Sequence, residues 1–202
     1  MTRARDFANV ISGNFDLPAG ALDNAGGGGT SFITKTTSSS VASVSFDNLS
    51  TDFDSYVFDL DMHPVSDNVY LGVYLLNSSG SVISGSGNYG YQYFDEGTHT
   101  NQSSSGIIKI CDAAIGFGAY EGVRAKLYLL GRNFTTTDNN QCPPVVVGQG
   151  LYSSSVGGIP ADFVFAGNML DDNAQTIRGI QFLFSSGNIY RSEISAYGMK
   201  LS

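Results

Sequence analysis

Carboxylates that recur two positions apart are the first residues in this 202-residue chain that could do chemistry. Asp59 and Asp61 alternate with apolar residues, and Asp52 and Asp54 lie shortly before them. Alternate residues of a strand share one face, so Asp59 and Asp61 are expected to lie close together. Calcium takes several oxygen ligands at such a density. No Asp-x-Asp-x-Asp-Gly loop follows, so we favour a solvated outer strand face over a metal site.

The same carboxylates could serve a glycosidase, whose two acids flank the bond that is cleaved. Glycosidase sites lie in grooves that usually carry aromatic stacking residues, and this chain has no tryptophan. The two histidines are His63, which precedes a proline, and His99, which lies in a polar segment. No Gly-x-Ser-x-Gly elbow stands between a strand and a helix, and no phosphate-binding loop is present. We therefore expect both histidines at the surface and no catalytic residue.

Two cysteines, Cys111 and Cys142, have no CxxC or Cys/His spacing around them. A disulfide would need an oxidising compartment, and no export signal is visible. We expect two separate, mostly buried thiols, and neither a structural metal nor another cofactor.

The strongest candidate for a binding surface is a row of tyrosines. Tyr89, Tyr91 and Tyr93 alternate along one predicted strand, and His99 follows in a polar loop predicted over 95–106. Tyrosine offers a flat apolar face and a hydroxyl, which suits contact with sugar or protein. The alternative is that this face packs in a sheet interior or at a subunit contact.

Composition excludes several classes of function. The formal net charge is −8, with 10 basic and 18 acidic residues and no basic run. Binding to nucleic acid or to an anionic membrane surface needs clustered lysine and arginine, so both are disfavoured. No apolar stretch approaches the roughly 20 residues that span a bilayer. The N-terminus also lacks a secretory h-region, so we expect synthesis and folding in a cytoplasm.

Hydrophobic periodicity predicts an all-β protein. Short segments with period-two alternation are separated by turns rich in Gly, Ser and Asn, and no β-α alternation appears. We expect an antiparallel two-sheet sandwich, most similar to a jelly roll. The expected strands are 32–37, 41–46, 55–62, 69–76, 89–94, 107–110, 123–130, 145–147, 150–153, 162–165, 177–184 and 193–201.

The first 30 residues follow a different pattern. Phe7, Val10 and Ile11 fall on one face of a short helix, and Phe15 and Leu17 follow in an extended piece. So short a helix would not persist alone in water, so we expect these five apolar residues to dock on a partner. The predicted organisation is an anchoring segment (1–25), a glycine-rich hinge (26–30) and a β-sandwich domain (31–202).

Two parts of the chain carry a family resemblance. RARDFA (3–8), with ISG (11–13) and DLPAG (16–20), resembles a segment of virion structural and tail-fibre-like proteins of marine and cyanobacterial tailed bacteriophages. RGIQF (178–182), SSGNI (185–189) and ISAYGMK (194–200) resemble the last two strands of the β domain in that group. Residues 32–62, followed by Pro64, Asp67 and Asn68, look similar but are less specific.

The resemblance implies a part of a phage particle, commonly trimeric or attached to a symmetric platform, and it carries no active-site residue. The expected function is a non-enzymatic, fibre- or adhesin-like virion module, localised to the virion and assembled in the host cytoplasm. Expected partners are other capsid or tail proteins, further copies in a homotrimer and a host surface glycan or receptor. The alternatives are a capsid decoration (cement) protein and a glycan-binding or glycan-cleaving host-recognition protein.

Overall fold

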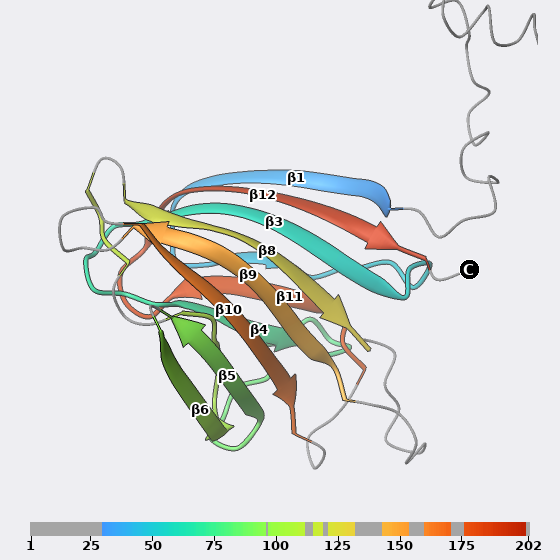
Figure 1. Ribbon diagram of the computed structural model, residues 1–202. Helices are drawn as coiled ribbons and strands as arrows, with labels where there is room; N and C mark the ends of the chain where they lie inside the picture. The colour runs from blue at the N-terminus through green and yellow to red at the C-terminus, as the bar shows by residue number, and fades with distance from the viewer. Residues whose placement is uncertain are drawn as a thin grey trace, which may run out of the picture. The chain divides into compact units, whose positions relative to one another are not determined.

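A computed structural model describes residues 30–95, 97–111, 115–118, 121–131, 143–153, 160–170 and 176–200 (Figure 1). The contacts group residues 30–200 into one compact unit. The described residues form strands, turns and loops without an α-helix, and they contain no helix with the length and apolarity needed to span a bilayer. The predicted anchoring segment and most of the predicted hinge lie outside these residues.

The described chain forms two antiparallel sheets. The larger sheet has the order β1-β12-β3-β8-β9-β10-β5-β6, and the smaller has the order β2-β11-β4-β7. The strands are β1 (Thr30–Val41), β2 (Val44–Phe46), β3 (Ser55–Pro64), β4 (Leu71–Leu76), β5 (Tyr89–Asp95), β6 (Thr98–Ser105), β7 (Ile108–Lys109), β8 (Gly122–Leu130), β9 (Val145–Ser153), β10 (Pro160–Met169), β11 (Gly179–Phe184) and β12 (Ile189–Met199).

Eight of these strands have the pairing of a jelly roll, in which the chain folds back on itself from both ends. β1 pairs with β12, β2 with β11, β3 with β8 and β4 with β7. β12 also pairs with β3, and β11 with β4, which closes the two four-stranded layers. This is the double-sheet arrangement of two Greek keys. The predicted all-β, jelly-roll-like sandwich is confirmed.

Two insertions widen one layer of the jelly roll. β5 and β6 lie between β4 and β7 in the sequence, and β9 and β10 lie between β8 and β11. β9 adds to β8, β10 adds to β9, and β5 and β6 follow, so four strands become eight. The prediction of a loop over 95–106 is wrong, since 98–105 is the edge strand β6. An edge strand can be polar on both faces, so β6 lacks the alternation that marks a buried strand.

The core lies between the two layers and comes from alternate residues of each strand. Tyr56, Phe58, Leu60 and Met62 of β3 are all buried, as the alternation of that segment predicts. Phe58 packs edge-on against Phe182 of the smaller sheet, with ring centroids 5.6 Å apart. The opposite face of β3, with its two aspartates, is the outer face of the larger sheet.

The inserted strands share this core rather than forming one of their own. The hydroxyl of Tyr89 on β5 donates to the carbonyl of Ile83 at 2.7 Å and accepts the N–H of Leu75 at 3.1 Å. On β10, a Cβ built on Gly167 would lie against the side chain of Ile108 of β7. The inserted strands β5 and β10 therefore pack on the smaller sheet, as the strands of the eight-stranded jelly roll do.

One buried hydroxyl gives a prediction for stability. Ser192 on β12 is 1% exposed, and its Oγ has no hydrogen-bond partner among the described residues. Replacing Ser192 by alanine removes an unsatisfied polar atom, so we expect the free energy of unfolding in urea to rise by about 1 kcal/mol. Ser195→Ala on the same strand, at a partly exposed position, is the control and should change it by less than about 0.5 kcal/mol. A loss of stability in Ser192→Ala would contradict the prediction.

Candidate functional site

The tyrosine row lies on the inner face of the larger sheet. Tyr89 is 0% and Tyr93 3% exposed, while Tyr91 is partly buried and packs against the core. The Tyr91 and Tyr93 rings stack, with centroids 6.2 Å apart. Tyr89 and Tyr93 are therefore not surface recognition residues, and that prediction is wrong. The alternation was identified correctly, but the smaller sheet covers this face, so the alternative of a packed strand holds.

The opposite face of the same strand is the exposed one. Gln92 and Phe94 point outward from β5, and in the register of the hairpin they lie opposite Asn101 and His99 of β6. The rings of Phe94 and His99 stack with centroids 4.4 Å apart and planes 17° from parallel. His99 is exposed, as predicted, and it belongs to the outer face of the sheet.

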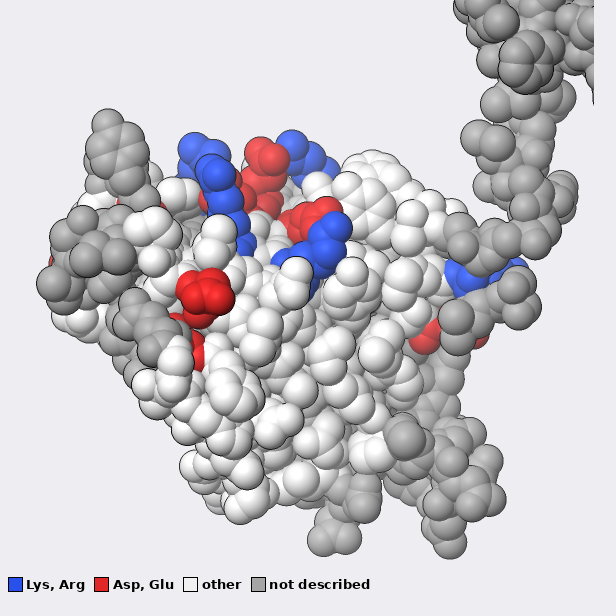
Figure 2. Space-filling view, in the orientation of Figure 1, with Lys and Arg blue, Asp and Glu red and all other residues white. Residues whose placement is uncertain are grey.

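Strand register arranges the outward side chains in rows that cross the sheet. One row runs through Glu193, Asp61, Arg124, Leu151 and Asp162. The next runs through Lys35, Ser195, Asp59, Lys126, Gln149, Val164, Phe94 and His99. Most charged side chains thus gather over β1, β12, β3 and β8, as Figure 2 shows, while the members of these rows on β9, β10, β5 and β6 are uncharged except Asp162.

Asp59 and Asp61 lie on one face, as their spacing predicts, and each faces a cation from β8. Lys126 Nζ is 3.3 Å from Asp59, and an Arg124 nitrogen is 3.3 Å from Asp61. His63 Nε2 lies 3.1 Å from Asp61 on the same strand. Among the described residues, no group of three or more His, Cys, Asp or Glu side chains could hold a metal ion. The two aspartates belong to cross-strand pairs on a solvated face.

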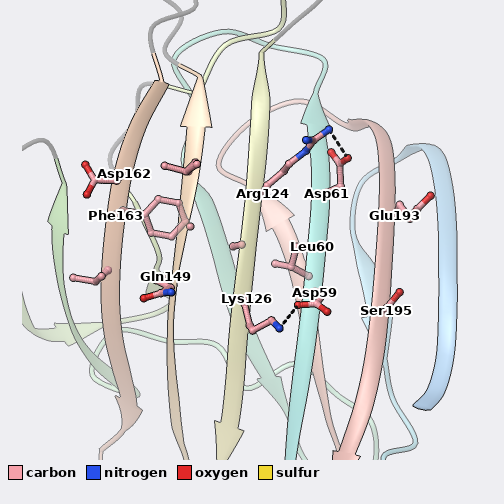
Figure 3. A pocket seen from close by; sticks show the side chains of 14 residues that line it. Asp59, Leu60, Asp61, Arg124, Lys126, Gln149, Asp162, Phe163, Glu193 and Ser195 are labelled. Atoms are coloured by element: carbon pink, nitrogen blue, oxygen red, sulfur yellow. Dashed lines mark ion pairs between the residues drawn. The ribbon is translucent and has the colours of Figure 1, made fainter. Parts of the chain in front are cut away.

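The outer face is hollowed over β3, β8, β9 and β10. A depression of about 750 Å³ lies there, bordered by the two ion pairs on one side and by β10 on the other (Figure 3). In Figure 3, Lys126 points towards Asp59 and Arg124 towards Asp61, while Gln149 on β9 lies between them and Asp162 on β10. A second depression of about 470 Å³ lies over β10, β5 and β6.

Apolar side chains are exposed along the same region. Leu151 on β9 is 55% exposed, Val164 on β10 48% and Phe94 on β5 51%. Val164 is paired directly with Phe94, and Gln149 is paired with Val164. We refer to this region of Leu151, Val164, Phe94, Gln149 and Asp162 as the recognition face. It combines apolar contact area with hydrogen-bonding groups on rigid strands.

Sequence reasoning missed the recognition face, although a signal for it was present. Asp162 and Val164 alternate with Phe163 and Phe165, which marks the even-numbered residues of this segment as the outward side. The missing information was which strands are neighbours, because Gln149 and Phe94 reach Val164 only through the pairing of β9, β10 and β5. Such pairing joins residues far apart in the sequence.

The remaining predicted site residues fall in two groups. The docking residues Phe7, Val10, Ile11, Phe15 and Leu17 lie outside the described residues, as does Cys142. Cys111 is fully buried in the core, as expected for a thiol in a β-sandwich.

Comparisons with known proteins assign no family. No protein-family model matches the chain, and no curated protein matches it. Among solved structures, a crystal structure of a protein of unknown function from Shewanella oneidensis MR-1 shows 12% sequence identity. That match covers 85% of this chain and 77% of the other, with a TM-score of 0.20.

Proposed function

We propose that this protein is a bacteriophage virion structural protein, a non-enzymatic fibre- or adhesin-like β module attached to the particle through its N-terminal segment. The observation that carries the proposal is the widened outer face of the jelly roll. Two insertions enlarge one sheet and add Leu151, Val164 and Phe94 to its outward surface. Neighbouring exposed apolar side chains with polar groups around them are typical of a surface that contacts another molecule.

The fold and the sequence resemblance support the same proposal from different directions. Jelly rolls form viral capsid domains and lectin domains, which are structural and binding roles. A fold hosts many functions, so this support is an analogy. The resemblance of residues 3–20 and 178–200 to virion proteins adds the expectation of a particle-bound partner and of a homotrimer.

Deleting residues 1–25 tests the attachment. We expect the remaining chain to stay soluble and to keep its β structure, because every strand of the two sheets begins at Thr30 or later. We expect it to be lost from purified phage particles, because the apolar side chains of Phe7, Val10 and Ile11 would no longer be available to dock. Circular dichroism checks the fold, and mass spectrometry of particles checks incorporation.

A substitution pair separates docking from simple truncation. Val10→Asp together with Ile11→Asp should abolish incorporation, whereas Thr2→Asp, outside the apolar spacing, should preserve it. Normal incorporation of the deleted or doubly substituted chain would refute the anchor. Immunogold labelling should place the wild-type protein on the tail, and labelling over the head shell would replace the fibre role with that of a decoration protein.

A further inference from the structure

We propose that the recognition face binds a neutral, hydroxyl-rich glycan chain in a trough that follows β10, with β8 and β9 on one side and β5 and β6 on the other. This inference deepens the proposed function, since it names the chemical class that the exposed face contacts. It is carried by three observations of the outer face: its shape, its alternation of polar and apolar groups, and its balance of charge.

The shape favours a chain over a single small molecule. The two depressions follow one another along β10, whose outward residues Asp162 and Val164 line the first and Ala166 and Asn168 line the second. Residues two apart on an antiparallel strand are separated by roughly 6.8 Å, so these four positions span about 20 Å. Two depressions in line over that length, which we call the trough, have room for several linked sugar units.

Polar and apolar groups alternate across this trough. Gln149, Asp162, Gln92 and Asn101 supply amide donors, amide acceptors and a carboxylate, and all four are exposed. The side chains of Gln149 and Asp162 make no hydrogen bond or ion pair with the described protein, so both can exchange water for a ligand. Leu151, Val164 and Ala166 are the strand partners of Asp162, Gln149 and Gln92 and offer apolar surface beside them. A pyranose ring matches such a surface, because it carries hydroxyl groups on its rim and C–H groups on its faces.

The charges favour a neutral ligand. The first depression and its border carry four carboxylates, those of Asp59, Asp61, Asp162 and Glu193. Three cations lie beside them: Lys35, Arg124 and Lys126. The net charge of this group is therefore −1 (4 − 3 = 1 excess carboxylate). Asp162 is the carboxylate that has no cation beside it among the described residues. An acidic polysaccharide would meet like charge beside an exposed carboxylate, which disfavours its binding.

An extended polypeptide fits this face less well. A peptide strand gains most of its affinity from main-chain hydrogen bonds at a sheet edge, and the trough lies on the face, where the main chain is already paired. The apolar contacts are also short and interrupted by polar residues, unlike the pockets that anchor large peptide side chains. Pre-organised side chains on paired strands suit a ligand that is recognised through many separate hydroxyl contacts.

Binding of the full chain to immobilised sugars tests the proposal. The probes are a glycan microarray with neutral and uronic-acid oligosaccharides, and affinity electrophoresis through gels that contain dextran, mannan or polygalacturonate. We expect binding to at least one neutral glycan and none to polygalacturonate. Gln149→Ala and Asp162→Ala should each weaken that binding about tenfold, which corresponds to losing one or two hydrogen bonds.

A matched control lies at the far edge of the same sheet. Phe32 on β1 is 61% exposed, packs against Tyr197 and lines neither depression. Phe32→Ala should bind the glycan within twofold of wild type, whereas Val164→Glu, which places a carboxylate without a partner cation beside that of Asp162, should abolish binding. Circular dichroism and thermal melting of each variant show whether a loss of binding reflects unfolding.

Three outcomes would overturn the inference: no neutral glycan bound, preferential binding of uronic-acid glycans, or undiminished binding by folded Gln149→Ala and Asp162→Ala. Capture of gelatin peptides in competition with the glycan would assign the trough to polypeptide instead. The test is separate from that of the proposed function. Presence in particles without glycan binding refutes only the trough, and glycan binding by a protein absent from particles refutes only the virion role.

Discussion

Replacing Gly150 by alanine should destabilise the protein by roughly 3 kcal/mol or more, at the upper end of the cost of overpacking a core. Gly150 lies on β9 with its hydrogens towards the core. A Cβ there would press on the carbonyl oxygen of Arg124 in the neighbouring strand and would come within 2.7 Å of Phe163 Cζ. The backbone oxygen belongs to the β8–β9 ladder and cannot move without loss of pairing.

Gly148 repeats this arrangement two residues earlier, where Phe165 Cε1 would be 2.8 Å from an added Cβ. The two glycines therefore make room for the rings of Phe163 and Phe165, which are buried aromatic side chains of β10. Since Gln149 and Leu151 alternate with these glycines on the outer face, a shift of β9 should also disturb the recognition face.

Urea unfolding measures the loss of stability in Gly150→Ala, and hydrogen exchange shows whether protection is lost along β8, β9 and β10. Gly97→Ala is the control, because Gly97 has φ near +79° but nothing within 4 Å of a Cβ. It should cost about 1 kcal/mol from backbone strain alone. Equal effects of the two substitutions would show that close packing at Gly150 is not the cause.

Tyr89→Phe should lower the free energy of unfolding by about 1–3 kcal/mol, although it removes a single oxygen atom. The hydroxyl joins β5 to β4 by accepting the N–H of Leu75, and it donates to the carbonyl of Ile83. Tyr89 is 0% exposed, so water cannot replace the lost partner of the Leu75 N–H. The cost is that of a buried donor left unsatisfied.

Alkaline pH offers a second measurement on Tyr89. Burial raises the pKa of the Tyr89 hydroxyl well above its usual value near 10, so the folded protein keeps the proton. The unfolded chain releases that proton above about pH 10. This difference in proton binding favours the unfolded state, so the free energy of unfolding of the wild type falls as the pH rises through that range. The Tyr89→Phe variant lacks this contribution, and the gap in stability between the two proteins should narrow there.

Tyr190 provides the matched control for Tyr89. It is 56% exposed and contacts Phe117 through its ring, with centroids 5.8 Å apart. Tyr190→Phe should change stability by less than about 0.5 kcal/mol at neutral pH. A comparable small effect of Tyr89→Phe would mean that the hydroxyl does not hold the inserted hairpin on the smaller sheet.

How far the sequence predicted this structure differs from strand to strand. In β3, the segment from Phe58 to Met62 alternates between apolar residues and Asp59 or Asp61, and both faces were assigned correctly. In β5, the alternation of Tyr89, Tyr91 and Tyr93 was recognised but assigned to the wrong environment. Tyrosine has an apolar ring and a polar hydroxyl, so the residue type suits a core as well as a surface.

The anchoring role of Phe7, Val10, Ile11, Phe15 and Leu17, the virion localisation and the homotrimer stay predictions from the sequence and its resemblance. The deletion of residues 1–25 and the particle analysis address the first two directly. Light scattering of the purified chain addresses the third.

By itself, the sequence determined the class of the fold, because period-two alternation and turn residues act within a few neighbouring positions. It also placed Asp59 and Asp61 together, since that requires one strand only. The tertiary structure alone decided that two insertions join one layer of the jelly roll, that the tyrosines lie inward and that Gln149, Val164 and Phe94 meet outside. These arrangements depend on pairing between distant strands, whose hydrogen bonds are made by the backbone and therefore leave little trace in side-chain pattern.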